Sequence, residues 1–526
     1  MSEKKRIAKA AGVVGAFTFL SRILGFIRDV VIATYFGAGL SADAFFVAFR
    51  IPNLLRRLLA EGSLTVSFVP VFTEYLTKKS KKDALELANI AFTILSMILV
   101  LISILGIILS PLIIRIMAPG FADTPEKLGL TILLTRIMFP YIFFIGLIAL
   151  CMGILNSLRH FTAPALSPVL LNISMIVAVL CLSKYFDQPV LSLAIGVIVG
   201  GIFQLILQFP FLRKMGVGLR LDFNFSHPAV KRIGLLMLPA VFGAAAYQFN
   251  IFISTLIASF LPEGSISYLY YANRLIEFPL GIFAVAIGTA VLPTMSRYAA
   301  EENFEDLKDA LSFALRLVFF VTIPAMVGLI ALRVPIVSIL FMRGEFDYQT
   351  TLLTAEALLY YSVGLWAIAG VRIIVPTFYS LQDTRTPVKI AIVTLFANII
   401  LSIVLAFPLG LGHGGLALAT SISSIMNLMI LLMILRKRLG GIGVKRVFIS
   451  VSKISLSSIV MGIIVYLFCC RIQWGVISDI GEKVFILGGG IVIGAAVFFL
   501  CSYFLRSEEF YSFVRIVRDK INGNKK

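Results

Sequence analysis

Long apolar runs alternate with short polar segments from one end of the chain to the other. A run of 18 or more apolar residues is typical of a helix that crosses a membrane. We therefore predict an all-α polytopic membrane protein with fourteen spans. The spans are expected at residues 12–36, 44–72, 84–117, 129–157, 163–183, 189–212, 230–260, 266–296, 309–341, 352–380, 388–408, 414–435, 447–470 and 484–505.

The composition agrees with this pattern, because 59% of the residues are hydrophobic and only 14% are charged. The formal net charge of +19 raises nucleic acid as a ligand. However, the basic residues lie mostly in short loops between apolar runs, and no basic domain is present on which a duplex could dock. We expect no nucleic-acid partner.

The basic loops predict the orientation of the chain. Alternate loops hold clusters of lysine and arginine, at residues 4–9, 78–82, 213–232 and 436–446 and in the tail from Arg506, whereas the opposite set holds few. By the positive-inside rule, both termini are expected in the cytoplasm. The N-terminus looks like a signal peptide, but its apolar run carries arginines and leads into a second span, so we interpret it as a retained first helix.

The chain also resembles itself. Ala48-Phe49-Arg50-Ile51 matches Ala272-Asn273-Arg274-Leu275 at an offset of 224 (272 − 48), and Ser157-Leu158 matches Ser380-Leu381 at an offset of 223 (380 − 157). We predict two six-helix lobes from an internal duplication, residues 1–222 and 223–445, followed by two extra helices and a basic cytoplasmic tail in residues 446–526. Parallel repeats of this kind are typical of carriers that hold their substrate between lobes.

Charged residues interrupt the first, second and eighth spans. A charge near the middle of a membrane helix costs roughly 2.5 to 3.5 kcal/mol on insertion scales, so it normally faces a wet cavity. Arginine binds phosphate well because its planar fork forms bidentate hydrogen bonds and stays protonated. We predict a positive cavity for a phosphate, a pyrophosphate or another polyanion, lined by Arg22, Arg28, Arg56 and Arg274.

Further polar residues share faces with these arginines at helical spacing. Asp29 nearly superposes on Arg22, and Glu277 follows Arg274 by three residues. One stripe of the second span carries Asp43, Arg50, Arg57 and Glu61, and Asn53 and Arg56 flank it on the same side. Structural roles remain open for four of them. Arg57 and Glu61 would then pair near a helix end, Arg50 would extend to the membrane interface, and Asp43 would cap its helix or close a gate.

Several motifs resemble the bacterial lipid II flippase MurJ (MviN) family, of the multidrug, oligosaccharidyl-lipid and polysaccharide exporter superfamily. They include Ser21-Arg22-x-Leu24-Gly25-Phe26-x-Arg28-Asp29, Pro52-Asn53-Leu54-Leu55-Arg56-Arg57 and Tyr270-Tyr271-Ala272-Asn273-Arg274-Leu275-x-Glu277-Phe278-Pro279. The resemblance implies a fourteen-helix inner-membrane protein that moves undecaprenyl-pyrophosphate-linked peptidoglycan precursor, lipid II, from the inner to the outer leaflet by alternating access. Its expected partners are lipid II, membrane lipids and other cell-wall synthesis proteins.

Matching positions carry the family's roles onto single residues. Arg22, Arg28, Arg56 and Arg274 correspond to its cavity arginines, and Asn53, Glu277 and Ser21 are expected beside them as substrate-binding residues. Asp29, Asp43, Arg50 and Glu61 are expected to gate the cavity or to pair charges. Asn273 departs from members that have aspartate there, so a charge-dependent role is not expected at that position.

The driving force is open between sodium and the membrane potential. Some members of the family bind sodium with an asparagine and an aspartate four residues apart. The equivalents here are Asn398 and Ser402, so a carboxylate is missing and Asn398 is only a weak metal candidate. No cofactor, catalytic residue or phosphate loop for ATP hydrolysis is expected.

Four alternative functions are weighed against this interpretation. A flippase for another polyprenyl-linked oligosaccharide would use the same architecture, whereas a related exporter of cationic drugs would need buried carboxylates to dominate. A membrane glycosyltransferase would need a catalytic carboxylate or metal motif in a large loop, which the sequence lacks. A scaffold for cell-wall enzymes would not need buried arginines.

Overall fold

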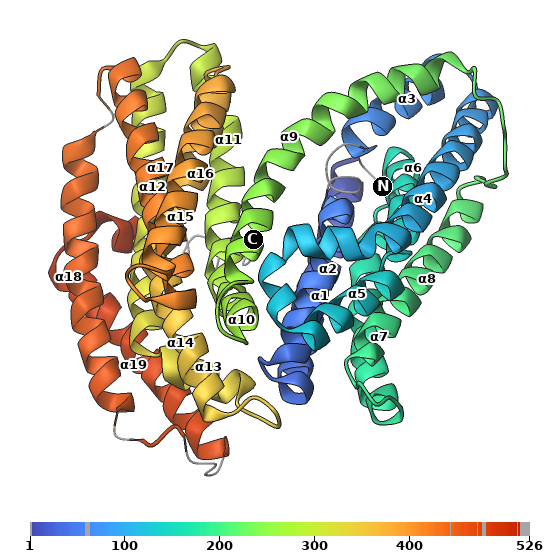
Figure 1. The fold of residues 1–526 in the computed structure, drawn as a ribbon. Helices are drawn as coiled ribbons and strands as arrows, with labels where there is room; N and C mark the ends of the chain where they lie inside the picture. Colours follow the sequence, from blue (N-terminus) through green and yellow to red (C-terminus); the bar gives the residue numbers. More distant parts are fainter. Residues whose placement is uncertain are drawn as a thin grey trace. The chain divides into compact units, whose positions relative to one another are not determined.

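The computed structural model describes residues 3–57, 64–441, 443–470, 472–475, 480–512 and 514–515, and for residues 3–11, 65, 240–247 and 444 it describes the backbone alone. Every regular element in these ranges is helical (Figure 1). The chain forms two compact units, Met1–Ser267 and Tyr268–Lys526. Each unit is a bundle of helices and is described separately below.

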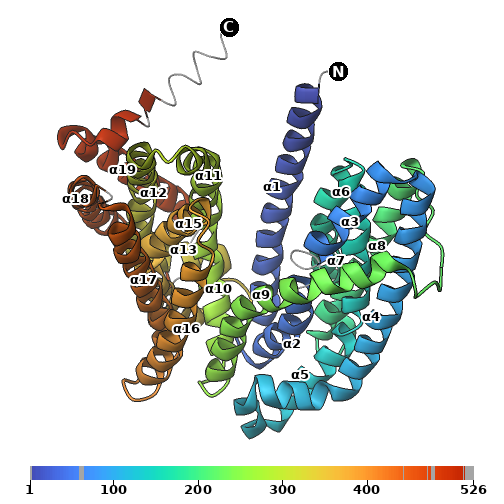
Figure 2. The same cartoon turned by 90° about the horizontal axis from the view of Figure 1, so that it is seen from above.

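The first unit begins with the long helix α1 (Glu3–Phe36), which packs on α7. Helix α6 contacts α3, α4 and α8, and α8 also contacts α5 and α7. Figure 2 shows α9 lying across α3 and α4. The elements are α2 (Leu40–Arg56), α3 (Leu64–Lys78), α4 (Lys81–Met117), η2 (Pro119–Asp123), α5 (Pro125–Met138), α6 (Tyr141–Ser157), α7 (Thr162–Leu182), η3 (Ser183–Tyr185), α8 (Leu191–Lys214) and α9 (Pro228–Ala258).

Helix α9 belongs to the first unit, although the sequence repeat assigns it to the second half of the chain. Ala229 of α9 packs in a small core with Val71 of α3 and Leu87 of α4. Arg232 forms a 2.8 Å ion pair with Glu74 of α3. The loop that follows α9 therefore stays with the first bundle, which matters for the candidate site.

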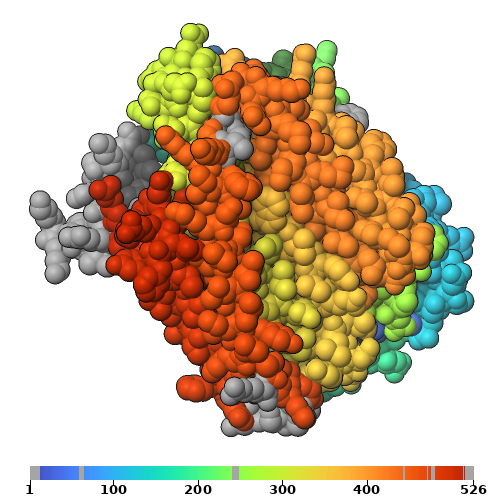
Figure 3. Space-filling model, turned by 90° about the vertical axis from the view of Figure 1, so that its left-hand side faces the viewer, coloured from blue at the N-terminus to red at the C-terminus, as the bar shows by residue number. Residues whose placement is uncertain are grey.

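The second unit centres on α12, which contacts α11, α14, α15 and α18. Helices α18 and α19 run along one face of this unit (Figure 3). Its elements are α10 (Ser265–Pro279), η4 (Leu280–Ala284), α11 (Val285–Ala300), α12 (Phe304–Ala331), α13 (Arg333–Phe341), α14 (Tyr348–Val363), α15 (Leu365–Ser380), α16 (Arg385–Ala406), α17 (Gly412–Leu439), α18 (Val444–Cys469) and α19 (Ile480–Phe504).

Ten helical segments within the described residues are long and apolar enough to cross a membrane, and the bent pair α14 and α15 raises the number to eleven. The outer faces of these helices are apolar. In α4, for example, Leu101, Ile108 and Leu112 are more than half exposed. Such surface needs hydrocarbon rather than water around it, so the chain is an all-helical, multi-pass membrane protein.

Several predicted spans are interrupted in the structure. Residues 44–72 include the separate helices α2 and α3, and residues 352–380 bend by 42° between α14 and α15. The bend occurs at Gly364, where a Cβ atom would lie 2.7 Å from the backbone of Ser421 in α17. The bend thus lies where α17 approaches the backbone closely. A hydropathy pattern cannot show such an approach.

Helix starts and turns recur at one spacing. Ser80 caps α4 by accepting a hydrogen bond from the Asp83 N–H, and Asn303, 223 residues later, caps α12 in the same way through Asp306. The turn after α6 has a positive φ at Arg159, and the turn after α15 has one at Gln382, again 223 residues later. Matching caps fix matching helix starts, because both satisfy the first unpaired N–H groups.

Candidate functional site

Arg28 of α1 lies buried against α7. Its Nε and Nη2 atoms donate to Oδ1 of Asp29 at 3.1 and 2.7 Å, and Nη1 donates to Oδ1 of Asn172 at 3.0 Å. The Asn172 amide in turn donates to the backbone oxygen of Ser21 at 3.2 Å. Ser21, Arg28, Asp29 and Asn172 therefore form one network, and a buried cation is held by an anion and an amide, as low polarity requires.

Arg22 lies one and a half turns before Arg28 on the same helix, and its side chain is exposed. On α2, Asn53 orients Arg56 by accepting a 3.1 Å hydrogen bond from its Nε atom, and both residues are partly buried. Arg50 donates to Thr255 of α9 and to the backbone oxygen of Ile251. The first unit thus contains three predicted cavity arginines in two helices, of which Arg28 is buried, Arg56 is partly buried and Arg22 is exposed.

Arg274 belongs to α10 in the second unit. Its Nη1 atom lies 3.2 Å from Oε2 of Glu277, and Asn273 donates to the other oxygen of Glu277 at 3.4 Å. The Arg274 guanidinium also lies over the Tyr270 ring, 5.8 Å from its centroid. Arg274 and Glu277, three residues apart in the sequence, thus form an ion pair. Their role in substrate binding, and the convergence of Arg274 with the arginines of the first unit, stay predictions.

Asp43 is a buried carboxylate whose two oxygens both have hydrogen-bond donors. It is 1% exposed and accepts four hydrogen bonds. Oδ2 accepts from Lys127 Nζ at 2.7 Å and from the Gly264 N–H at 2.9 Å. Oδ1 accepts from the N–H and the hydroxyl of Ser267 at 3.0 and 2.7 Å. Asp43 therefore joins α2 to α5 and to the α9–α10 connection.

Two further contacts hold the same connection. Glu263 accepts a 2.6 Å hydrogen bond from the Leu40 N–H at the start of α2. Ser259 accepts a 3.1 Å hydrogen bond from the Gly120 N–H in η2. We call the segment Ser259–Ser267 with these contacts the α9–α10 latch. Its polar contacts are these hydrogen bonds and the ion pair between Asp43 and Lys127, and one apolar side chain of the segment, Ile266, is buried.

Sequence reasoning missed two residues of these networks. Asn172 lies in a mostly apolar helix, and an amide side chain at membrane depth was the available signal. In the sequence, Lys127 is one of the few basic residues of the loops opposite the basic clusters, which indicates no more than chain orientation. It is 6% exposed and also lies over the Phe121 ring at 4.4 Å, so its low exposure, which is a tertiary property, reveals its role.

The remaining candidates lie apart from these networks. Asn398 of α16 is buried and donates to the Ser423 hydroxyl of α17 at 3.1 Å, and Ser402 is buried one turn further on. Among the described residues, no group of three or more histidine, cysteine, aspartate or glutamate side chains could hold a metal ion. Glu61 lies outside the described residues, so its predicted role in gating or charge pairing stays a prediction.

Comparisons with known protein sequences point to one family. The family model described as "Lipid II flippase MurJ" matches residues 32–485. A protein named "Probable lipid II flippase MurJ" from Vibrio cholerae is 41% identical over 434 residues, which are 81% of this chain and 82% of that protein. "Lipid II flippase MurJ" from Burkholderia cenocepacia is 38% identical over 82% of this chain and 84% of its own length.

Solved structures agree. "Lipid II flippase MurJ, inward closed conformation" is 32% identical, has a TM-score of 0.78 and covers 94% of this chain and 98% of its own. An inward-facing multidrug transporter of the MATE family is 17% identical, with a TM-score of 0.66 over 82% of this chain and 98% of its own, and shows the shared fold alone. The match over most of the chain shows that this protein belongs to the lipid II flippase MurJ family, a family of transporters rather than enzymes.

Proposed function

We propose that this protein moves lipid II from the inner to the outer leaflet of the bacterial inner membrane by alternating access. Family membership supports the substrate. The single observation that best supports the mechanism is the buried network of Arg28, Asp29 and Asn172. It fixes a guanidinium in a membrane helix, and fixed donors bind a pyrophosphate with less loss of side-chain freedom than mobile donors do.

The proposed architecture has fourteen spans in two six-helix lobes, with α18 and α19 outside the repeat. The constant spacing of structural features supports the duplication. Helices α6 and α15 end at Ser157 and Ser380, and α7 and α16 begin at Thr162 and Arg385, each pair 223 residues apart. Two lobes with the same sequence of caps and turns are suited to move as similar rigid bodies about a common substrate.

In the proposed cycle, Arg22, Arg28, Arg56 and Arg274 bind the pyrophosphate and sugars, with Ser21, Asn53 and Glu277 beside them, while the prenyl chain stays in lipid. Without an anion, bringing these cations together is repulsive. A bound pyrophosphate removes that repulsion and so favours closure, which is the differential affinity that couples a ligand to a conformational change.

The α9–α10 latch is the proposed gate on the outer side. Asp43 holds the Gly264–Ser267 backbone and Lys127 together, and release of that carboxylate would free the connection. Asp29 pairs its charge with Arg28, and Arg50 donates to Thr255 and to the Ile251 carbonyl of α9. Both termini are proposed to lie in the cytoplasm, and the membrane potential is proposed to reset the cycle, because moving one charge across 100 mV is worth about 2.3 kcal/mol.

The test is a flipping assay in proteoliposomes with Arg28→Ala and Arg274→Ala. Both variants should lose most lipid II flipping while retaining expression and monodisperse elution. Arg115→Ala is the matched control, since Arg115 is an exposed arginine in the last turn of α4 and should retain flipping. Wild-type rates in both cavity variants would reject the arginine cavity, and equal transport of another polyprenyl-linked oligosaccharide would reject lipid II specificity.

A further inference from the structure

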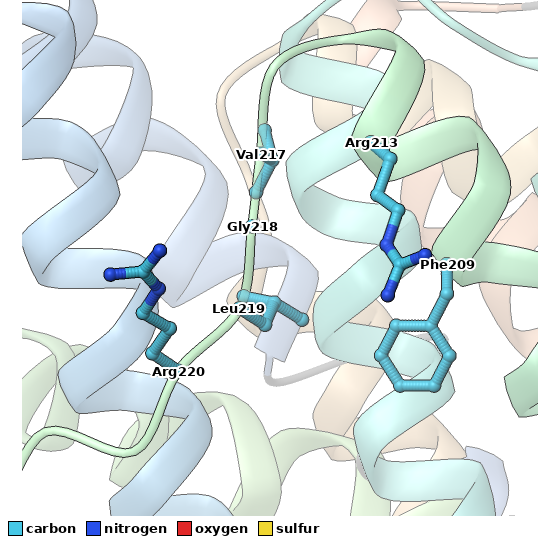
Figure 4. Close-up of a pocket in the computed structure, with 6 residues that line it drawn as sticks. All are labelled: Phe209, Arg213, Val217, Gly218, Leu219 and Arg220. Atoms are coloured by element: carbon cyan, nitrogen blue, oxygen red, sulfur yellow. The ribbon is translucent and has the colours of Figure 1, made fainter.

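A second positively charged region lies at the C-terminal end of α8. A cavity of about 420 Å³ opens there between the helix and the loop that follows it (Figure 4). Its volume is enough for a phosphate group with part of an attached alcohol. The cavity is lined by Phe209, Arg213, Val217, Gly218, Leu219 and Arg220.

The loop that forms this cavity is anchored at both ends. Lys81 at the start of α4 donates to the backbone oxygen of Met215 at 3.1 Å. Further along, the side chain of Asn89 in α4 accepts from the Arg220 N–H at 2.9 Å, and Thr93 accepts from the Asp222 N–H at 2.8 Å. Side chains of α4 therefore hold the loop backbone in place, and the cavity is preorganised.

The charge of the cavity is not compensated locally. Among the described residues, no carboxylate forms an ion pair with Arg213 or Arg220, and neither arginine has another side-chain hydrogen bond. The nearest acid in the sequence, Asp222, accepts a 3.1 Å hydrogen bond from the Asn224 N–H in its own loop. Two unpaired guanidinium groups beside one cavity create a field that attracts anions.

The two arginines contribute differently. In Figure 4 the Arg213 guanidinium lies beside the Phe209 ring, and the Leu219 side chain extends from the loop toward them, whereas Arg220 extends away to the other side. Within the described residues, the backbone N–H groups of Gly218 and Leu219 have no hydrogen-bond acceptor. Arg213 with these amides is therefore suited to contact an anion, and Arg220 to strengthen the field.

We propose that this cavity binds a phosphate group, with Arg213 as its principal ligand. The chemistry fits both an anionic glycerophospholipid head group and a free phosphate. Phe209, Val217 and Leu219 give the cavity an apolar wall, and such a wall suits the glycerol and first methylenes of a lipid better than a bare ion. The site is distinct from the proposed lipid II cavity and does not depend on it.

The sequence repeat supplies a matched control. Arg436 lies 223 residues after Arg213, in the last turn of α17, and is likewise exposed and followed by lysine. It does not line the cavity. Arg213→Gln and Arg436→Gln thus remove the same charge from the same position of two related helices, and only the first change removes a cavity ligand.

The experiment uses the full chain, purified in detergent and checked by thermal unfolding. Native mass spectrometry measures retention of phosphatidylglycerol against phosphatidylcholine, with and without millimolar inorganic phosphate. Arg213→Gln should weaken phosphatidylglycerol retention about tenfold, the size expected for one charge-assisted bidentate contact. Arg220→Gln should weaken it by about threefold at low salt, and Arg436→Gln should leave it unchanged.

The phosphate arm separates the two sources. Retention that survives inorganic phosphate assigns the site to a lipid, and displacement by inorganic phosphate assigns it to a soluble phosphate, so either result supports the site. Equal losses in Arg213→Gln and Arg436→Gln, or no preference for phosphatidylglycerol in the wild type, would overturn the proposal. Flipping activity is not the readout, so failure here leaves the proposed transport function untouched.

Discussion

The buried charges of the first unit's networks are each satisfied by neighbouring side chains. Asp43 and Lys127 are each less than a tenth exposed and contact each other at 2.7 Å, while Arg28 is shared between Asp29 and Asn172. Removing one partner of such a pair lowers the free energy of unfolding by more than the intact pair contributes to it, because the other charge stays buried without an opposite charge. This asymmetry makes conservative single substitutions informative.

Replacing Asp43 with asparagine should destabilise the protein by about 3 to 5 kcal/mol, because Lys127 would remain buried without its anion. The change keeps the side-chain shape, so any loss comes from charge and hydrogen bonding. Thermal unfolding of the detergent-purified variant measures it. Asp123→Asn is the matched control, because Asp123 is exposed at the end of η2.

A double variant tests the physical reason behind this expectation. Asp43→Asn combined with Lys127→Met removes both charges and should be less destabilised than the sum of the two single variants. Strict additivity would show that Lys127 does not depend on Asp43.

Asn172→Leu should reduce flipping while costing about 1 to 3 kcal/mol of stability. The leucine has similar volume but neither accepts from Arg28 nor donates to Ser21, so the guanidinium loses its orientation. The proteoliposome flipping assay measures the first effect and thermal unfolding the second. Ser174→Ala, a second buried polar site on α7, should flip at the wild-type rate; a loss as large as that of Asn172→Leu would argue against a specific role.

At the scale of elements, close backbone approach sets the connections between helices. A Cβ atom on Gly120 in η2 would lie 2.2 Å from the backbone oxygen of Ser259. Backbone cannot yield as a flexible side chain does, so an alanine there must push the α9–α10 latch away. The elements themselves would remain intact.

Gly120→Ala should therefore expose Ser265, which is now only 2% exposed. In a background without native cysteines, Ser265→Cys should react faster with a membrane-impermeant maleimide when Gly120→Ala is present. Gly129→Ala is the control, because nothing lies within 4 Å of its added Cβ atom. Equal labelling rates in the two backgrounds would rule out displacement of the latch.

The turn between α15 and α16 carries a predicted pH effect. The Thr386 backbone N–H and hydroxyl donate to Asp383, and together with Arg438 they hold the pKa of that carboxyl below its ordinary value of 3.8. Because the folded pKa lies below the unfolded pKa, the stabilisation is complete above pH 3.8 and is lost as the pH falls through the folded value.

Wild-type protein should consequently unfold at a higher temperature than Asp383→Asn at pH 7 and at pH 5, and this difference should shrink below about pH 4. Thermal unfolding of both proteins across this range is the measurement. A difference that stays constant down to pH 3 would mean that the carboxylate charge contributes nothing to the turn.

For the whole molecule, a substrate that binds the folded state must stabilise it. Lipid II at about 100 times its Kd should add about 2.7 kcal/mol to the free energy of unfolding. A combined Arg22→Gln and Arg28→Gln variant should lose this gain, and Arg115→Gln should keep it. Thermal unfolding with lipid II or undecaprenyl phosphate measures the gain, and equal stabilisation by both lipids would contradict recognition of the pyrophosphate-linked head group.

The sequence by itself determined the membrane class, the helical nature of the chain and its family, because hydropathy and family motifs are local properties that survive without coordinates. It also placed Arg274 and Glu277 three residues apart on one helix, a spacing at which the two side chains are neighbours, and they form an ion pair in the structure. The 223-residue spacing of caps and turns was likewise present in the sequence, as the offset between its matching motifs.

Only the tertiary structure decided the partners of the buried charges. Asp43 meets Lys127 from 84 residues away and Ser267 from 224, and Arg28 meets Asn172 from 144. The break at Gly364 and the attachment of α9 to the first unit were also decided there. Each depends on which helices pack side by side. Hydropathy does not contain that information, because the helix faces that contact lipid and those that contact other helices are both apolar.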